Sequence, residues 1–322
     1  MRHSLVVLLI ISGIATTLLL SISFGSVSIP FVSIMEILLN PDGSTWSRIV
    51  WELRLPRALF AFIIGGMLAL AGVLMQALLR NPLADPYILG TSGGAAAAML
   101  VAFLLAVPVE LHPFMALAGA AFSTLLLLSI TGLRQGLQQQ PLLLSGIILT
   151  TGWGALITFL LTAAPTARIP GMLFWLIGDL GESSSLLLPA ATLTAGLVAA
   201  LLLAKPLDML LLGDLQAASL GVSVRSLRSM LLAVAVAVTA IAVTFAGPIG
   251  FVGLVTPHLV RLLSGPSHRR LIPACVLLGG ALMMAADLLS RTIIAPRQMP
   301  VGVFTAMIGV PLFLYLMKKR LQ

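Results

Sequence analysis

Apolar runs without a charged residue recur along the whole chain, and they constrain its fold more than any other feature. The first run, residues 5–24, is 20 residues long. A helix rises about 1.5 Å per residue, so a run of this length crosses the roughly 30 Å hydrocarbon core of a bilayer. A cleaved signal peptide is the alternative, because Arg2 and His3 precede the run, but its apolar part exceeds the usual stretch of about 7–15 residues.

The composition indicates an integral membrane protein. Apolar residues make up 59% of the chain and charged residues 9%, with a mean hydropathy of +1.13, whereas soluble domains carry roughly 25% charged residues. The net charge of +8 does not indicate a nucleic-acid binder, because the cations are scattered at the ends of apolar runs. Cys275 is the single cysteine and the four histidines are dispersed, so we expect neither a disulfide framework nor a metal site.

Ten segments have the length and composition of membrane spans, which predicts an all-α, polytopic membrane protein. They cover residues 5–24, 58–79, 88–107, 113–133, 142–164, 186–204, 229–246, 248–263, 271–289 and 301–317. The eighth segment is short, so it either crosses with few residues or re-enters. Residues 26–52 are expected to form a loop with at most one short interfacial helix. Residues 169–180 form an amphipathic piece too short to span the membrane.

The distribution of cations favours a cytoplasmic position for both chain ends. With ten spans, 12 of the 18 cations fall on the side of the termini, where positive charge is normally enriched. The same division gives a net charge of +9 inside and −1 outside, which sums to the +8 of the whole chain. A nine-span arrangement would move the basic C-terminal end outside, so we reject it.

A polar segment over residues 205–228 separates two long apolar runs and cannot lie inside a bilayer. Within it, residues 216–221 predict a short helix with small side chains on one face. Gly221 supplies a left-handed cap, and basic residues follow it. The segment is therefore predicted to contact another protein on the cytoplasmic side, and an ordinary loop between two spans is the alternative.

The chain shows no energy source of its own. Its three lysines, Lys205, Lys318 and Lys319, are not preceded by the glycine that a phosphate-binding loop requires, which excludes an ATPase. A secondary carrier usually places ionisable residues inside its spans, and the apolar cores here carry none. An ion-coupled secondary carrier therefore remains only the weaker alternative to a permease that is energised by a partner.

Four motifs occur in the order and spacing of a known family. They are RLPR at 54–57, NPLADP at 81–86, AGPIGFVGLVTPH at 246–258 and QMPVGV at 298–303. With these motifs the chain resembles the permease subunits of type II ABC importers for iron complexes and vitamin B12, over nearly its whole length.

The resemblance implies a single transmembrane permease domain over residues 1–322, with ten helices, in the bacterial inner membrane. Two copies would form a homodimer around a central path, with two ATPase subunits on the cytoplasmic side and a periplasmic binding protein on the other. ATP would be bound by the ATPase, so no catalytic, cofactor or metal site is expected in this chain. The cargo would be a metal chelate such as an iron–siderophore or haem, with cobalamin as the alternative.

The resemblance also assigns roles to individual positions. Docking of the binding protein is assigned to Arg54, Arg57 and Arg291, although Asp287 lies four residues before Arg291 and can pair with it instead. Contact with the ATPase is assigned to the segment around the short helix, namely Gln216, Ala217, Ala218, Leu220 and Gly221. The cytoplasmic gate is assigned to the loops after the second and fourth spans, with Asn81, Pro82, Leu83, Gln140 and Leu142. Importers more generally carry a Glu-Ala-Ala pattern, which leaves the role of Asp214 open.

Overall fold

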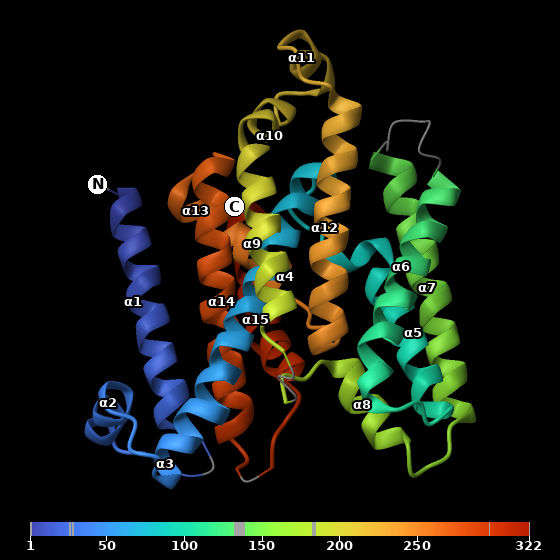
Figure 1. The fold of residues 1–322 in the computed structure, drawn as a ribbon. Coiled ribbons are helices and arrows are strands. Elements are labelled where there is room, and N and C mark those ends of the chain that lie inside the picture. The colour runs from blue at the N-terminus through green and yellow to red at the C-terminus, as the bar shows by residue number, and fades with distance from the viewer. Residues whose placement is uncertain are drawn as a thin grey trace.

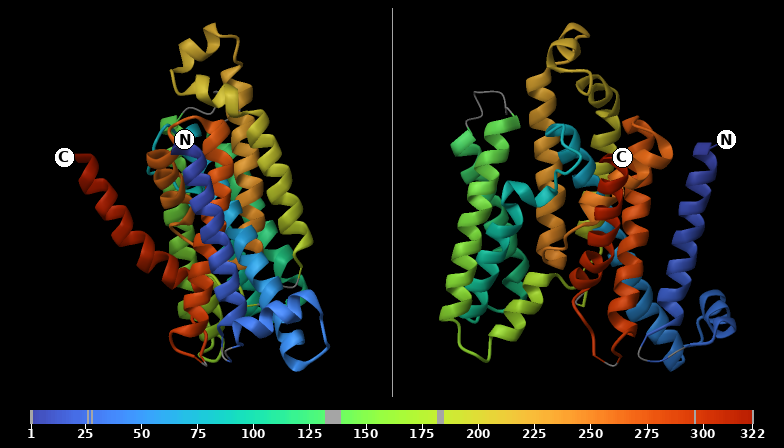
Figure 2. Two further views of the ribbon diagram at one scale, coloured as in Figure 1. Left: turned by 90° about the vertical axis from the view of Figure 1, so that its left-hand side faces the viewer. Right: turned by 180° about the vertical axis from the view of Figure 1, so that it is seen from behind.

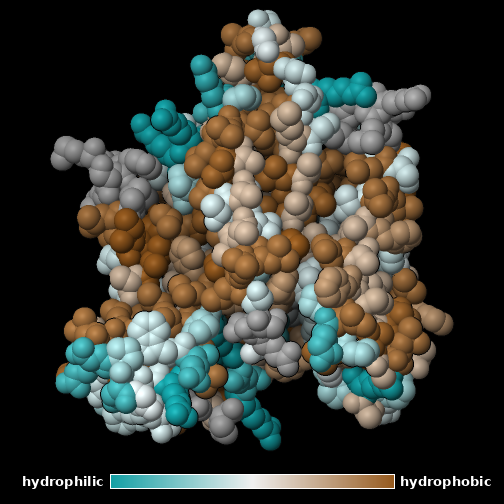
Figure 3. Space-filling view, viewed as in Figure 1, coloured by the Kyte–Doolittle hydropathy of each residue, from teal (hydrophilic) through white to brown (hydrophobic). Residues whose placement is uncertain are grey.

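The computed structural model describes residues 2–25, 27, 29–131, 139–181, 185–295 and 297–321. Within these residues all regular secondary structure is helical, and no strand occurs. Figure 1 shows the long helices running roughly side by side, with α11 at one end of the bundle and α3 and α8 at the other. Figure 3 shows that brown, hydrophobic residues form a belt across the middle while teal, hydrophilic residues gather towards the two ends. This is the surface expected of a chain that crosses a bilayer.

The ten predicted spans appear in order along the described chain. Five have the length of a full span: Thr45–Leu78, which ends in α4 (Leu55–Leu78); Val109–Thr131, which contains α6 (His112–Thr131); α7 (Gln139–Ala163); α12 (Val224–Ala246); and α14 (His268–Thr292). A sixth is a pair bent by 56°, α9 (Leu187–Leu202) with α10 (Ala204–Leu210). Four shorter apolar helices complete the set: Leu8–Ser23 within α1 (Arg2–Ser23), α5 (Thr91–Leu104), α13 (Val252–Ser264) and Val301–Tyr315 within α15 (Val301–Leu321). This order agrees with the predicted all-α fold of ten transmembrane helices, of which four are short and one is bent.

Helix α4 lies at the centre of the bundle because glycines allow other backbones to touch it. A Cβ atom at Gly65 would overlap the carbonyl oxygen of Gly279 in α14, and one at Gly72 would overlap the carbonyl oxygen of Gly253 in α13. Such contacts bring membrane helices within van der Waals reach without large side chains between them. From Ile64 onward α4 is buried on all sides, so its far end is held rigidly by its neighbours.

The second span begins earlier than the sequence predicts. Residues 45–52 were expected to belong to a loop, but they lie in α3 (Thr45–Arg48) and the π-helix η1 (Ile49–Arg54), which lead directly into α4. The Ser44 hydroxyl caps the start by accepting a hydrogen bond from the Ser47 N–H at 3.1 Å. Because Pro56 has no N–H to donate, the wider π turn before it costs no helical hydrogen bond at that position. The one short helix expected in this region is α2 (Phe31–Leu39).

Two short helices agree with the sequence prediction. Helix α8 (Ile169–Ile177) is too short to span a membrane, and it ends at Gly178, whose φ is +86°. Helix α13 has only 13 residues. It starts after Phe251, which has a φ of +70°, and it holds Pro257 in its interior.

Two long helices lie at the margin of the bundle. Only a small part of α7 is buried inside the structure, and Ile148 and Phe159 are among its exposed apolar residues. Helix α15 diverges from the body, as the left view of Figure 2 shows, and Met307 and Leu314 are exposed on it. The apolar faces of α7 and α15 are thus available to lipid or to a second chain.

Candidate functional site

The segment between α9 and α12 projects beyond the rest of the bundle (Figure 1). It contains α10 and the short helix α11 (Asp214–Ser219). Two hydrogen bonds close the end of α11: Gly221 N–H donates to the Ala218 carbonyl, and Val222 N–H to the Ala217 carbonyl, both at 3.0 Å. Gly221 has a φ of +84°. The predicted helix and its left-handed glycine cap are confirmed, but the helix starts at Asp214 rather than Gln216, because a carboxylate is favourable in a first helical turn.

The projecting tip carries exposed leucines. Leu215 is 88% exposed, and the same tip presents Leu211, Leu212 and Leu220. Of the residues predicted to contact a partner, Gln216, Ala218, Leu220 and Gly221 are exposed, whereas Ala217 is buried. Leu211, Leu212 and Leu215 were not predicted, although their signal is present in the sequence: apolar side chains in a segment too polar to enter the bilayer mark a contact surface.

An ion-pair cluster ties α11 to the end of α4. The Asp214 carboxylate accepts from Arg228 Nη2, at 2.9 and 3.1 Å, and it also pairs with Arg80 Nη2. The same Arg80 nitrogen donates to the Leu210 carbonyl oxygen at 2.7 Å. Arg80 has a φ of +46° and directly precedes the predicted gate residue Asn81. The Asp214 side chain therefore links the projecting helix to the turn where α4 ends.

The turn at Asn81 is held by local hydrogen bonds. The Asn81 side-chain oxygen accepts from the Leu83 N–H at 2.9 Å, and the Asn81 N–H donates to the Gln76 carbonyl oxygen at 3.2 Å. Pro82 is half-buried and Leu83 is 41% exposed. This arrangement gives a compact turn whose apolar Leu83 side chain remains free to meet another surface.

The second part of the predicted gate is not a loop. Gln140 and Leu142 lie in the first turn of α7, where Pro141 is tolerated because an N–H at that position has no helical acceptor. Gln140 is exposed and Leu142 is buried. Residues 132–138 before them lie outside the described residues. The two parts of the predicted gate are nevertheless neighbours, because Gln139 Nε2 donates to the Leu78 carbonyl oxygen at 3.4 Å.

Asp287 organises two of the three arginines that were predicted to dock a partner. It is fully buried in α14, with Arg57 Nε at 2.9 Å from Oδ1 and Arg291 Nε at 2.9 Å from Oδ2. The alternative pairing of Asp287 with Arg291 is thus confirmed. Arg57 also donates from Nη1 to Gln298 Oε1 at 2.9 Å, in an exposed position. Arg57 and Arg291 therefore lie together, and each has a partner within the chain.

Arg54 points elsewhere. Its Nη1 donates to the carbonyl oxygens of Ile22 at 2.6 Å and Ser23 at 2.9 Å, and its Nη2 donates to that of Val27. These acceptors include carbonyls at the end of α1 that have no helical donor. Arg54 thus caps α1 and is only 6% exposed.

A cavity of about 710 Å³ opens between α5, α6, α8 and α12, towards the end opposite α11. Three acidic or basic side chains, those of Glu110, His112 and Asp179, line it together with aromatic side chains of Phe103, Phe174, Trp175 and Phe245. Burial raises the pKa of the Asp179 carboxyl above its usual range, and the nearby Arg57 opposes that shift. Aromatic and ionisable side chains that are distant in the sequence therefore meet at this cavity beside α8.

Comparison with known proteins agrees with this architecture. The model of the FecCD transport family matches residues 9–319. The Fe(3+) dicitrate transport system permease protein FecD of Escherichia coli is 39% identical, over 97% of each chain. The hemin transport system permease protein HmuU of Yersinia pestis is 37% identical, over 93% of this chain and 91% of its own. The cobalamin import system permease protein BtuC of Halobacterium salinarum is 41% identical, over 84% of this chain and 74% of its own.

Solved structures share the fold. A structure assigned to an inward-facing metal-chelate type ABC transporter superimposes with a TM-score of 0.84 and 28% identity, over 98% of this chain and 99% of its own. PsaBC of Streptococcus pneumoniae shares the fold alone, with a TM-score of 0.58 and 18% identity over 88% of this chain and 95% of its own. The chain therefore belongs to the FecCD transport family and is a multi-pass permease of an ABC importer, a class that works with ATPase and substrate-binding partners.

Proposed function

We propose that two copies of this chain form the translocation path for a bulky metal chelate, with two ATPase subunits at the α11 end and a periplasmic binding protein at the α8 end. Each copy is one permease domain over residues 1–322, with residues 205–228 as its coupling segment. The observation that carries the proposal is the tip of exposed leucines on α11, which is joined through Asp214 and Arg80 to the turn at Asn81. The exposed apolar faces of α7 and α15 support pairing of two copies.

The cargo is inferred from chemistry that the relatives share. Fe(3+) dicitrate, hemin and cobalamin are all metal chelates, and relatives named for each of them match most of this chain. We propose iron chelates as the first candidate cargo. Cobalamin is the second candidate, because the permease of the cobalamin import system of Halobacterium salinarum is 41% identical to this chain. The test is a binding screen of the partner binding protein against ferric citrate, hemin and cobalamin, followed by uptake of the ligand that binds into proteoliposomes. Uptake that needs neither ATP nor the binding protein would contradict an importer and favour a secondary carrier.

The gate is proposed at the turn of Asn81, Pro82 and Leu83, with Gln140 exposed beside it and Leu142 packed beneath. Its support is the exposed Leu83 side chain and the Gln139 contact to the end of α4. Uncharged side chains suit this position, because they can close the path without holding a charged chelate.

Labelling of single cysteines is expected to place the α11 end in the cytoplasm. Leu215→Cys on α11 and Ser185→Cys before α9 are both exposed, and the native Cys275 is buried. A membrane-impermeant maleimide applied to spheroplasts should modify Ser185→Cys but not Leu215→Cys. Permeabilised cells should show modification of both. The opposite pattern in spheroplasts would place the α11 end outside the cell. It would overturn the proposed orientation, in which the α11 end and both chain termini lie in the cytoplasm.

Changes in the coupling segment are expected to reduce transport without loss of folded protein. Ala218→Arg adds a long charged side chain to an exposed position that we propose enters a groove of the ATPase. Gly221→Val forces a β-branched residue into a φ of +84°, which costs on the order of 1–2 kcal/mol. Gly43→Val is the matched control, because Gly43 has a φ of +69°, also lies in open space and is remote from α11 in sequence.

The measurement is co-purification of the ATPase together with ATP hydrolysis stimulated by the binding protein in liposomes. Both coupling variants should lose most of the stimulated rate, and Gly43→Val should keep it. Wild-type rates in both variants would show that residues 216–221 are an ordinary loop.

Docking of the binding protein is proposed to use Arg57. Its hydrogen bond to Gln298 lies in an exposed position, so a carboxylate of the binding protein can replace Gln298 as the acceptor. Arg57→Gln should weaken capture of the binding protein more than tenfold, since a desolvated charged contact is worth roughly 2–5 kcal/mol. Arg291 still pairs with Asp287 in this variant. By contrast, Arg54→Gln should lower the yield of folded protein. Unchanged capture by Arg57→Gln at physiological salt would contradict docking at this arginine.

A further inference from the structure

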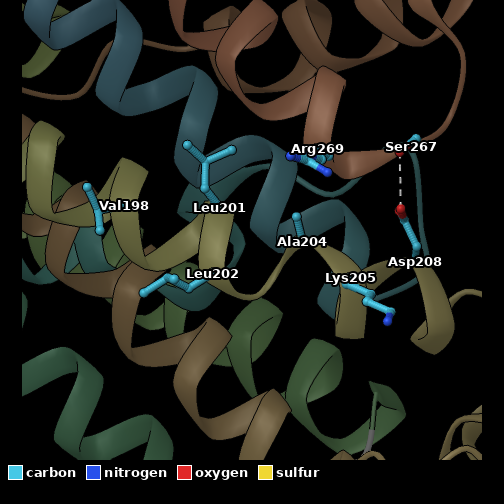
Figure 4. A pocket seen from close by; sticks show the side chains of 8 residues that line it. All are labelled: Val198, Leu201, Leu202, Ala204, Lys205, Asp208, Ser267 and Arg269. Atoms are coloured by element: carbon cyan, nitrogen blue, oxygen red, sulfur yellow. Dashed lines mark hydrogen bonds between the residues drawn. The ribbon is translucent and has the colours of Figure 1, made fainter.

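A recess of about 620 Å³ lies at the bend between α9 and α10, beside the start of α14 (Figure 4). Its lining residues are Val198, Leu201, Leu202, Ala204, Lys205, Asp208, Ser267 and Arg269. Figure 4 shows the valine and the two leucines on one side and the polar residues on the other. The recess therefore has an apolar wall and a polar end.

The apolar wall faces outward from the bundle. Leu202 is 77% exposed and Val198 is 53% exposed, and both belong to α9, one of the spans. In a bilayer such side chains are covered by acyl chains. The 56° bend after α9 turns the chain away from the span axis, and this leaves a hollow at the end of the apolar surface.

The polar end carries two cations without protein partners and one carboxylate that is fully engaged. Lys205 and Arg269 are exposed, and within the described part of the chain their side chains make no hydrogen bond or ion pair. Asp208 accepts from the His268 N–H at 2.9 Å and from the Ser267 hydroxyl at 3.2 Å, and its Oδ1 lies 2.7 Å from His268 Nδ1. Since Asp208 is directed to these groups, the two cations remain available for an anion.

We propose that this recess binds one anionic phospholipid. The phosphate lies between Lys205 and Arg269, and an acyl chain runs along Val198, Leu201 and Leu202. Cationic recesses between helices at the cytoplasmic surface are suited to anionic head groups, and long basic side chains reach that surface from the ends of spans. With the orientation proposed above the lipid belongs to the cytoplasmic leaflet. Because Lys205 lies in α10, the bound lipid also braces the base of the coupling segment.

The test is native mass spectrometry of the full-length permease, alone and assembled with its ATPase, in detergent with added phosphatidylglycerol or phosphatidylcholine. The wild type should retain one phosphatidylglycerol molecule more tightly than any further phosphatidylglycerol that it binds. Phosphatidylcholine should not replace that molecule. The double variant Lys205→Gln with Arg269→Gln should weaken this retention at least tenfold. The matched control, Arg270→Gln with Lys318→Gln, removes two exposed cations outside the recess and should leave retention unchanged.

Two further arms separate the lipid from other occupants. Val198→Asp should also weaken retention, because it places a charge against the acyl chain, and glycerol 3-phosphate should not compete with phosphatidylglycerol. Competition by glycerol 3-phosphate would show a site for a soluble anion and overturn the proposal. Loss of the lipid on assembly with the ATPase would show that the ATPase occupies the recess, and equal retention by the Lys205 and Arg269 double variant would show adventitious lipid. Either result also overturns the proposal, and neither bears on whether the permease transports a chelate.

Discussion

Replacing Gly72 with leucine is expected to abolish accumulation of folded permease. A Cβ atom at this position would overlap the carbonyl oxygen, carbonyl carbon and Cα of Gly253, all of which are backbone atoms. Backbone cannot rotate aside as a side chain can, so α13 would have to move away from α4, which belongs to the most buried of the five full-length spans. Overpacking of a core costs about 1–3 kcal/mol when side chains can adjust. Here the cost should exceed that range.

The measurement is the yield of monodisperse protein after extraction in mild detergent, with the thermal midpoint of whatever remains. Gly13→Leu is the matched control, because Gly13 lies in α1, where nothing comes within 4 Å of an added Cβ atom. That control should be recovered at the wild-type level. A wild-type yield and midpoint for Gly72→Leu would mean that α4 and α13 do not touch through backbone at this point.

The order and number of the spans could be predicted from the sequence, because each depends on a local property: a charge-free apolar run long enough to cross a bilayer. The start of α4 could not be predicted in the same way. The proline at position 56 signals a helix start, and only the π turn over Ile49–Arg54 reveals that the helix continues through it. The bend between α9 and α10 falls at the predicted end of the sixth span, residue 204, but the sequence did not reveal that a helix resumes there in a direction 56° away.

The candidate sites show the same division between local and distant information. The pair of Asp287 and Arg291 has the i, i+4 spacing of neighbours on one helix face, and its formation could be anticipated. The Arg57–Asp287 pair joins residues 230 positions apart, and the Arg80–Asp214 pair joins residues 134 apart. No periodicity connects such positions, so one sequence cannot reveal them. Asp214 in particular had no assigned role until the fold brought it to Arg80.

That contact leads to the most demanding expectation for the proposed mechanism, namely that Asp214→Ala uncouples ATP hydrolysis from transport. The leucine tip of α11 remains in place, so the ATPase should still bind and respond to the binding protein. The ion pair to Arg80 is lost, however, and with it the side-chain link between α11 and the turn at Asn81. Asp214→Ala also removes the ion pair to the buried Arg228, so the loss of stability should exceed the roughly 1 kcal/mol of an exposed pair, and the yield of folded protein is measured alongside. Transport should fall at least tenfold while stimulated hydrolysis stays within about twofold of wild type.

A double-mutant cycle decides whether Arg80 is the partner that matters. If the link runs through one ion pair, Arg80→Ala should lose transport to the same extent, and the double variant should be no worse than either single variant. Asp214→Glu preserves the charge and should recover part of the transport rate. Ser226→Ala, at an exposed position in the first turn of α12 and outside residues 216–221, serves as the control for general disturbance of the coupling segment. Additive losses in the double variant, or hydrolysis that falls in step with transport, would mean that Asp214 stabilises α11 without transmitting its movement to the gate.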